Sequence, residues 1–349
     1  MDKINLYGLE MSKLEQLMVE RGQKKFRAVQ LYTWMYEKEA QSFDEMTDIS
    51  LSFREVLKSD FNLELPKIFT KQESKDGTIK LLLELGDGSK VETALMPYRY
   101  GNAICVTSQV GCNMSCAFCA SGLLKKKRNL EVHEIVGQVL VMNQLLKDKG
   151  ERVSHVVVMG TGEPFDNYDN VMDFIRIINH PKALAIGARH ITVSTCGLVS
   201  GIMRYAKEGL QTNLAISLHA PNDVIRNRLM PISKAYPMDQ LMEAVHYYEK
   251  ESGRRVTFEY IMLKDVNDSI ECAEQLVKLI RGTLAYVNLI PYNPVDEKDF
   301  RRSDEKQVHR FFSYLMQHGI TTTVRKEFGN DIDAACGQLR AKEQRHANN

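Results

Sequence analysis

From residue 103 onward, short β-rich runs alternate with helical patterns, and this alternation limits the possible folds more than any other feature. The candidate strands span 104–107, 154–159, 190–194, 213–218, 255–262 and 286–290. Helical patterns include 132–146, 169–178, 269–280 and 305–317. Strands separated by helices form parallel βαβ units, so we predict an α/β fold, either a barrel or a doubly wound sheet. Its chemistry should lie at the carboxyl ends of the strands.

The rest of the chain divides into further parts. Residues 1–70 read as helical, with apolar faces that include Leu14, Met18 and Leu31. Residues 78–85 and 90–96 flank a Gly-Asp-Gly turn, which indicates a β-hairpin. The final segment contains a strand at 321–326, a polar loop and a charged tail. We therefore expect a helical accessory domain over 1–70, a hairpin linker over 71–100, a main domain over 101–319 and a C-terminal segment over 320–349.

Composition excludes several classes of protein. Apolar residues make up 44% of the 349 residues and charged residues 26%, as in ordinary globular enzymes. No apolar run is long enough to span a membrane, and the N-terminus does not resemble a secretory signal. The seven cysteines are odd in number, which argues against a disulfide framework and for reduced thiols in the cytoplasm. The net charge of +1 neither supports nor excludes an RNA partner.

A cysteine triplet is the strongest local signal for chemistry. It reads Cys112-Asn-Met-Ser-Cys116-Ala-Phe-Cys119 and follows a candidate strand. Three thiolates on one tight loop can hold three irons of a cubane cluster and leave the fourth iron open to another ligand. A structural zinc site is the alternative, with His133 or Cys105 as the fourth ligand, although neither has the usual spacing.

This triplet resembles the signature of radical S-adenosylmethionine enzymes, which bind S-adenosylmethionine at the open iron of a [4Fe-4S] cluster. Four further motifs resemble the RlmN/Cfr family of RNA methyltransferases within that superfamily. They are CVTSQVGC at 105–112, MGTGEP at 159–164, NLAISLH at 213–219 and DIDAACGQL at 331–339. The resemblance extends over nearly the whole chain and implies a partial (β/α)6 barrel with an N-terminal accessory domain.

The resemblance also implies how S-adenosylmethionine is bound. Gly162 and Glu163 follow a candidate strand, and two glycines beside a carboxylate suit close approach to the methionine ammonium group. Polar groups at other strand ends suit a ribose, a carboxylate and an adenine edge. Each of these alone could be an ordinary satisfied polar group, but family members use the corresponding positions. The residues are Ser194, Ser217, Leu218, His219 and Asn293.

A second pair of thiols is implied to be catalytic. Cys336 matches the family cysteine that a first S-adenosylmethionine methylates. A second S-adenosylmethionine, reduced at the cluster, gives a radical that removes a hydrogen atom from this methyl group. The resulting methylene radical adds to an adenine carbon of the RNA, and the Cys105 thiolate then attacks the Cys336 sulfur to release the product and a disulfide. Glu92 matches a family glutamate described as a proton acceptor, with Cys105 as the competing assignment.

The implied partners are 23S rRNA and tRNA, with flavodoxin or ferredoxin as the electron donor, and we expect a monomer. Three basic segments are candidate phosphate contacts: residues 21–27, residues 125–128 and the Arg301-Arg302 pair. Methylation at carbon 2 of adenine is the favoured reaction, and the Cfr-type reaction at carbon 8, which confers antibiotic resistance, is an alternative. A zinc-containing RNA-binding protein without catalysis is the alternative from another class.

Overall fold

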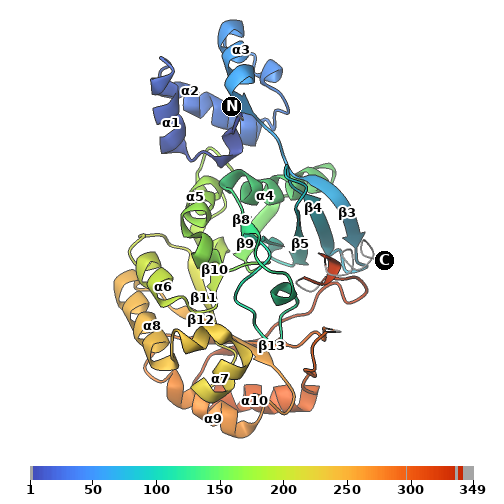
Figure 1. The fold of residues 1–349 in the computed structure, drawn as a ribbon, viewed down its shortest axis with the longest axis vertical. Helices are drawn as coiled ribbons and strands as arrows, with labels where there is room; N and C mark the ends of the chain where they lie inside the picture. Colours follow the sequence, from blue (N-terminus) through green and yellow to red (C-terminus); the bar gives the residue numbers. More distant parts are fainter. Residues whose placement is uncertain (1–2, 296, 335–336, 341–349) are drawn as a thin grey trace.

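The computed structural model describes residues 3–295, 297–334 and 337–340. An N-terminal lobe stands at one end of the molecule (Figure 1). It contains α1 (Met11–Glu20), α2 (Phe26–Tyr32), a π-helical turn (Thr33–Glu37) and α3 (Leu51–Asp60). The short parallel pair β1 (Ile4–Asn5) and β2 (Phe61–Asn62) joins the beginning of the lobe to its end. Apart from strand β1, the helices of this lobe confirm the helical prediction up to Asp60.

The N-terminal lobe packs directly on the rest of the chain. The buried faces of its helices belong to the same apolar cluster as the core of the main domain. The ring of Tyr32 meets the ring of His180 edge to face at 5.4 Å, and Lys13 forms an ion pair with Asp173. A Cβ on Gly8 would stand 3.3 Å from the backbone nitrogen of His133. This close packing fixes the lobe against the helices of the main domain.

Parallel strands form most of a ten-stranded sheet, whose order is β14-β13-β12-β11-β10-β9-β6-β5-β4-β3. All six predicted strands of the main domain are present, and β14 confirms the seventh. The two end strands, β14 and β3, do not pair with each other in the described part of the chain, so the barrel is open. The parallel strands are β6 (Gly101–Cys105), β9 (Val153–Val158), β10 (Ile191–Thr195), β11 (Asn213–Ser217), β12 (Val256–Met262), β13 (Tyr286–Pro291) and β14 (Thr322–Val324).

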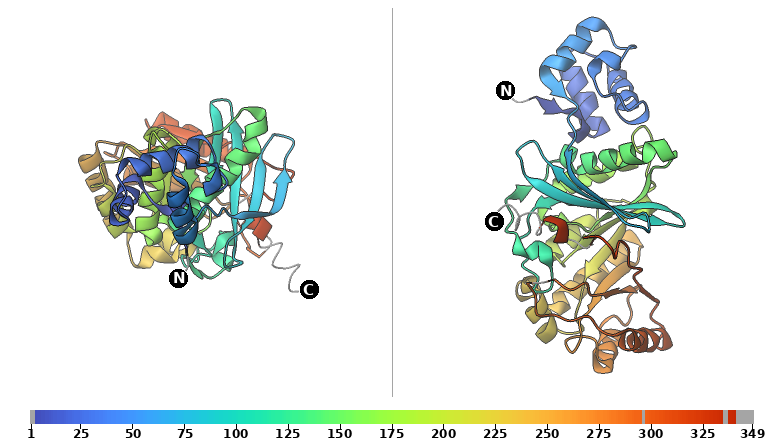
Figure 2. Two further views of the ribbon diagram at one scale, coloured as in Figure 1. Left: turned by 90° about the horizontal axis from the view of Figure 1, so that it is seen from above. Right: turned by 90° about the vertical axis from the view of Figure 1, so that its right-hand side faces the viewer.

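Three antiparallel strands extend this sheet beyond β6 (Figure 2). They are β5 (Lys90–Tyr98), β4 (Ile79–Glu84) and β3 (Lys67–Glu73). The pair β4–β5 confirms the predicted hairpin. The helical prediction for residues 1–70 was wrong at residues 4–5, 61–62 and 67–70, which are strands. Ile68, Phe69 and Thr70 favour an extended backbone, and β3 pairs with β4 along its length.

Helices connect the parallel strands and cover the outer face of the sheet (Figure 1). Those predicted at 132–146 and 305–317 match α4 and α10, and those at 169–178 and 269–280 match α5 and α9 within one residue at each end. In the described part of the chain, none of the helices has the length and apolar character needed to cross a bilayer. The helices are α4 (Val132–Leu146), α5 (Tyr168–Asn179), α6 (Val199–Tyr205), α7 (Asp223–Leu229), α8 (Met238–Ser252), α9 (Ile270–Leu279) and α10 (Glu305–Gln317).

Candidate active site

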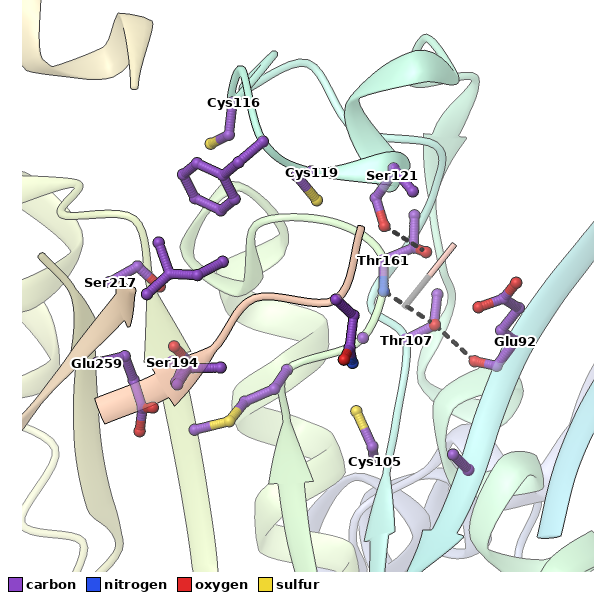
Figure 3. A pocket seen from close by; sticks show the side chains of 18 of the residues that line it. Glu92, Cys105, Thr107, Cys116, Cys119, Ser121, Thr161, Ser194, Ser217 and Glu259 are labelled. Atoms are coloured by element: carbon purple, nitrogen blue, oxygen red, sulfur yellow. Dashed lines mark hydrogen bonds between the residues drawn. The ribbon is translucent and has the colours of Figure 1, made fainter. Parts of the chain in front are cut away.

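A cavity of about 340 Å³ lies at the carboxyl ends of the parallel strands, where an α/β fold usually places its chemistry. The strand ends, the cysteine loop, strands β4 and β5 and part of the C-terminal segment form its wall. Figure 3 shows the loop of Cys116 and Cys119 above the strand ends. Glu92 lies on one side of this view and Glu259 on the other. Segments far apart in the sequence therefore face one space.

The cysteine loop follows the short strand β7 (Gln109–Val110), which pairs with β8 (Arg128–Asn129). Gly111 turns the chain here with a φ of +81°, and a Cβ would stand 2.2 Å from a backbone carbonyl oxygen. The backbone N–H of Ala117 donates to the carbonyl of Leu229 at 2.8 Å, which holds the middle of the loop against the end of α7. The cysteines that line the cavity from this loop are Cys112, Cys116 and Cys119.

The chemistry of these donors fits an iron–sulfur cluster. Among the described residues, no three His, Cys, Asp or Glu side chains converge closely enough to hold one metal ion. The thiolates of a cubane cluster each bind a different iron, so they stand further apart than the ligands of a single zinc ion. Burial raises the pKa of the Cys112 thiol to about 11 and also raises the pKa of Cys116. Metal binding must therefore displace these protons.

The glycine-rich loop after β9 places a carboxylate at the cavity. Gly162 has a φ of +114°, and a Cβ there would stand 2.7 Å from the Cβ of Gln109. Glu163 is 2% exposed, and its two oxygens accept from the backbone N–H groups of Phe165 (3.0 Å) and Cys196 (2.7 Å). Burial raises the pKa of Glu163, although these hydrogen bonds oppose that effect. A buried carboxylate in this position can receive an ammonium group.

The structure brings most of the other predicted cofactor contacts to the same cavity. Ser194, Ser217, His219 and Asn293 line it from the carboxyl ends of β10, β11 and β13. Leu218 does not: its side chain is buried in the main core, and its backbone N–H donates to the carbonyl of Glu259. His219 accepts from the backbone N–H of Ile261 at 3.1 Å, and burial lowers its pKa to about 3. The ring of His219 is therefore neutral at physiological pH.

Cys105 and Glu92 lie on neighbouring strands, β6 and β5, and both line the cavity. Glu92 is only 4% exposed, although it lies in a hairpin. Lys80 forms an ion pair with it at 2.8 Å. Cys336 lies outside the described residues. The described residues before and after it contact this wall, since Ala334 lines the cavity and Gly337 donates its N–H to Glu92 at 2.7 Å.

Three cavity residues were missed by sequence reasoning. Lys80 and Glu259 are charged residues inside apolar strand sequences, a pattern that normally indicates a half-exposed strand. Burial raises the pKa of Glu259, which accepts from Asn288 at 2.8 Å. Cys196 is buried and lines the cavity beside Glu163. A signal was available for Cys196, because it lies two residues after the end of the strand predicted at 190–194.

Several cations of the three predicted basic segments form ion pairs within the fold, whereas others are exposed and available to contact phosphates. Lys126 forms an ion pair with Asp166 at 2.7 Å, and Arg128 forms ion pairs with Asp87 and Glu134. These two side chains of the 125–128 run are therefore used within the fold, whereas Lys125 and Lys127 are exposed. Other cations of the basic segments are also paired, as in Arg21–Asp60, Arg301–Asp265 and Arg302–Glu327.

Comparisons with known proteins give consistent results. The profile of the Radical SAM superfamily matches residues 106–280, and that of the ribosomal RNA large subunit methyltransferase N-terminal domain matches residues 4–63. A protein of Spiroplasma citri named "Probable dual-specificity RNA methyltransferase RlmN" is 57% identical over 97% of this chain and 98% of its own length. The protein of the same name from Geobacillus kaustophilus is 53% identical, over 98% of this chain and 93% of its own.

A solved structure has the same fold over nearly the whole chain. The crystal structure of a radical SAM methyltransferase from Sphaerobacter thermophilus superposes with a TM-score of 0.91 and 42% sequence identity. The match covers 96% of this chain and 98% of that one. The predicted partial barrel with an N-terminal lobe is therefore confirmed as a radical SAM fold.

Proposed function

Because this chain belongs to the RlmN family of dual-specificity RNA methyltransferases in the radical S-adenosylmethionine superfamily, we propose that it methylates carbon 2 of specific adenosines. The substrates are one adenosine of 23S rRNA and one adenosine next to the tRNA anticodon. One observation carries this proposal: the cysteines of the loop, Glu163 and Cys105 all line one cavity. An iron–sulfur cluster held by the cysteines, a cofactor bound at Glu163 and the Cys105 thiol could therefore all act on one RNA base in this cavity.

The cofactors are an iron–sulfur cluster and S-adenosylmethionine. We propose that Cys112, Cys116 and Cys119 hold a [4Fe-4S] cluster. When bound, the cluster and S-adenosylmethionine supply the one-electron chemistry that an unactivated carbon–hydrogen bond requires. Glu163 receives the methionine ammonium group, and Gly162 lets the backbone approach it. Ser194, Ser217, His219 and Asn293 bind the remaining polar groups, while Leu218 contributes through its backbone.

The chain's own thiols carry the methyl group. The Cys336 thiolate takes a methyl from one S-adenosylmethionine, forming a sulfur–carbon bond and releasing S-adenosylhomocysteine. After a hydrogen atom has been removed from this methyl with a second S-adenosylmethionine, the carbon joins adenine carbon 2 in a covalent protein–RNA adduct. The adduct loses the carbon-2 proton to a base and one electron to an acceptor, a role that the oxidised cluster would fill. The Cys105 thiolate then attacks the Cys336 sulfur, so that a disulfide forms and the bond from the Cys336 sulfur to the carbon breaks. The released carbon takes up a proton, and the methylated RNA leaves.

The partners follow from this reaction. We propose that residues 1–70 act as an accessory RNA-binding domain and that the exposed Lys125 and Lys127, beside the cysteine loop, contact phosphates. The target adenosine has to leave its base stack to enter a cavity of this kind. A flavodoxin or ferredoxin delivers the electron, and the chain acts as a monomer.

Two measurements test the function. Anaerobic purification followed by iron, sulfide and zinc analysis should give about four irons per chain, and Cys116→Ala should remove them. The variant Cys196→Ala, which changes another cavity cysteine, should keep its iron. Purified protein with labelled S-adenosylmethionine and 23S rRNA or tRNA should then label carbon 2 of adenosine, and Cys336→Ala should abolish labelling. Methylation at carbon 8 would instead indicate Cfr-type chemistry, and stoichiometric zinc would contradict a radical mechanism.

A further inference from the structure

The antiparallel extension of the sheet binds the C-terminal segment at several points outside the cavity. Gln72 on β3 makes a reciprocal pair with Asp333: its amide donates to the carboxylate at 2.9 Å, and its carbonyl oxygen accepts the Asp333 N–H at 3.0 Å. In the turn after β3, Ser74 donates to Asp331, and Asp76 accepts the N–H of Gly329 at 2.9 Å. The hairpin β3–β4 is therefore a platform for residues 329–334.

Glu92 continues this attachment beyond Cys336. Its Oε2 accepts the N–H of Gly337 at 2.7 Å, and its Oε1 accepts the N–H of Arg340 at 2.6 Å. Lys80 neutralises the carboxylate at 2.8 Å and also donates to the carbonyl of Ala334 at 3.4 Å. Lys80 and Glu92 thus bind the chain on both sides of residues 335–336. Each oxygen of the Glu92 carboxylate accepts a backbone N–H, so this one side chain binds residues 337 and 340 at the same time.

The same glutamate is connected to the cysteine loop (Figure 3). Its carbonyl accepts from the hydroxyl of Thr107 at 2.7 Å, and this hydroxyl accepts the N–H of Thr161 at 3.1 Å. The hydroxyls of Thr161 and Ser121 are 3.2 Å apart. A Cβ on Gly337 would stand 2.9 Å from the backbone nitrogen of Ser121. Hydrogen bonds and close packing therefore connect the C-terminal segment, Glu92 and the loop after the cysteines, so that the position of each depends on the others.

We propose that Glu92, together with Lys80, is a positioning pair that holds the segment carrying Cys336 at the cavity, and that Glu92 does not itself remove the adenine proton. This inference rests on the proposed function, in which Cys336 accepts a methyl group. The roles of positioning pair and general base predict that a Glu92 variant is defective at different steps of the reaction. A base for the RNA adduct is not needed when Cys336 is methylated without RNA, whereas a positioning pair is needed from that first step.

The test compares the full-length, cluster-loaded wild type with Glu92→Gln and Gln72→Ala. Gln72 lies on the platform and does not line the cavity, so it reports on positioning alone. Glu73→Gln, an exposed neighbour on β3 that pairs with Lys71, is the matched control. Mass spectrometry follows methylation of Cys336 with S-adenosylmethionine and no RNA. Hydrogen exchange of peptides from 329–340 follows the attachment of the segment, and circular dichroism checks that each variant is folded.

We expect Glu92→Gln and Gln72→Ala to slow Cys336 methylation by about 10- to 100-fold, the usual effect of a misplaced reacting group. Both should speed hydrogen exchange within 329–340, and Glu73→Gln should change neither. The proposal is overturned if Glu92→Gln methylates Cys336 at the wild-type rate and accumulates a covalent protein–RNA adduct. It is also overturned if exchange within 329–340 is unchanged. A wild type that never methylates Cys336 would contradict the proposed function, while the exchange experiment would still decide the role of Glu92.

Discussion

The backbone N–H of Cys196 donates to Oε2 of Glu163 at 2.7 Å, which ties the glycine-rich loop after β9 to the end of β10. With the second donor, Phe165, this contact fixes the carboxylate in a site where it is 2% exposed. Burial alone raises the pKa of Glu163, and hydrogen bonds counter it. An ammonium group arriving in the cavity would favour the charged form further. The protein therefore holds the Glu163 carboxylate in one position, which suits its proposed role of binding the ammonium group.

Glu163→Gln should weaken S-adenosylmethionine binding. The amide has no charge for the ammonium group, and its NH2 end faces a backbone donor. We expect a loss of about 10- to 100-fold in affinity, in line with a hydrogen bond to a charged partner. Isothermal titration on the anaerobic, cluster-loaded protein measures it. Glu208→Gln, which changes a carboxylate paired with Arg176 outside the cavity, is the control. Equal dissociation constants for the wild type and Glu163→Gln would remove Glu163 from the cofactor site.

Gly162→Ala should destabilise the fold as well as the site. The new Cβ would stand 2.7 Å from the Cβ of Gln109, at a φ of +114° that other residues rarely adopt. We expect a loss of roughly 1–3 kcal/mol or more in the free energy of unfolding. Gly150→Ala separates the two causes, because Gly150 also has a positive φ but has open space around it. Urea unfolding should show a clearly smaller loss for Gly150→Ala, and equal losses would mean that the close contact is unimportant.

The sequence predicted those features that depend on neighbouring residues. Runs of Val and Ile define the parallel strands, and the polar residues directly after them were expected at the cavity. The spacing of Cys112, Cys116 and Cys119 needs no knowledge of the fold. The partners of Glu92 could not be predicted, because Gly337 and Arg340 are about 245 residues away. The strands beyond Asp60 could not be predicted for the same reason, because residues 61–62 pair with β1 and residues 67–70 pair with β4.

The basic run beside the cysteine loop should divide into a structural and an RNA-binding part. Arg128 donates to both oxygens of Glu134 at 2.7 and 2.8 Å and to Asp87 at 2.9 Å. Removing it leaves the buried Glu134 carboxylate without its cation, so Arg128→Ala should lower the free energy of unfolding by about 1–3 kcal/mol. Lys127→Ala should change this free energy by less than about 0.5 kcal/mol.

Lys127→Ala, which should barely change the free energy of unfolding, should weaken RNA binding. A phosphate contact releases counterions, so Lys127→Ala should weaken binding to all RNAs and reduce the slope of log affinity against log salt by about 1. Filter binding at several salt concentrations measures both quantities. An unchanged slope would show that Lys127 contacts solvent and not the RNA backbone.

His219 should make the stability of the fold depend on pH. Burial, aided by Arg226, lowers its pKa to about 3, and its Nδ1 accepts from the backbone N–H of Ile261. Between pH 3 and the ordinary histidine pKa of about 6.5, the unfolded chain binds one more proton here than the folded chain. Falling pH therefore favours unfolding, by up to about 1.4 kcal/mol per pH unit below 6.5.

His219→Asn removes this titration and keeps a hydrogen-bond acceptor at the position of Nδ1. The Asn side-chain oxygen can replace Nδ1 as the acceptor for Ile261, and Asn tolerates the positive φ of 58° at this position. The variant should be less stable than the wild type at pH 7.5, because packing against Phe118 is lost. This difference in the free energy of unfolding should shrink as the pH falls from 6.5 to 5. Only the wild type loses stability in this range, because its unfolded chain takes up a proton at His219 and its folded chain does not. Urea unfolding at three pH values measures the difference, and a gap that stays constant would mean that His219 takes up its proton in the folded state.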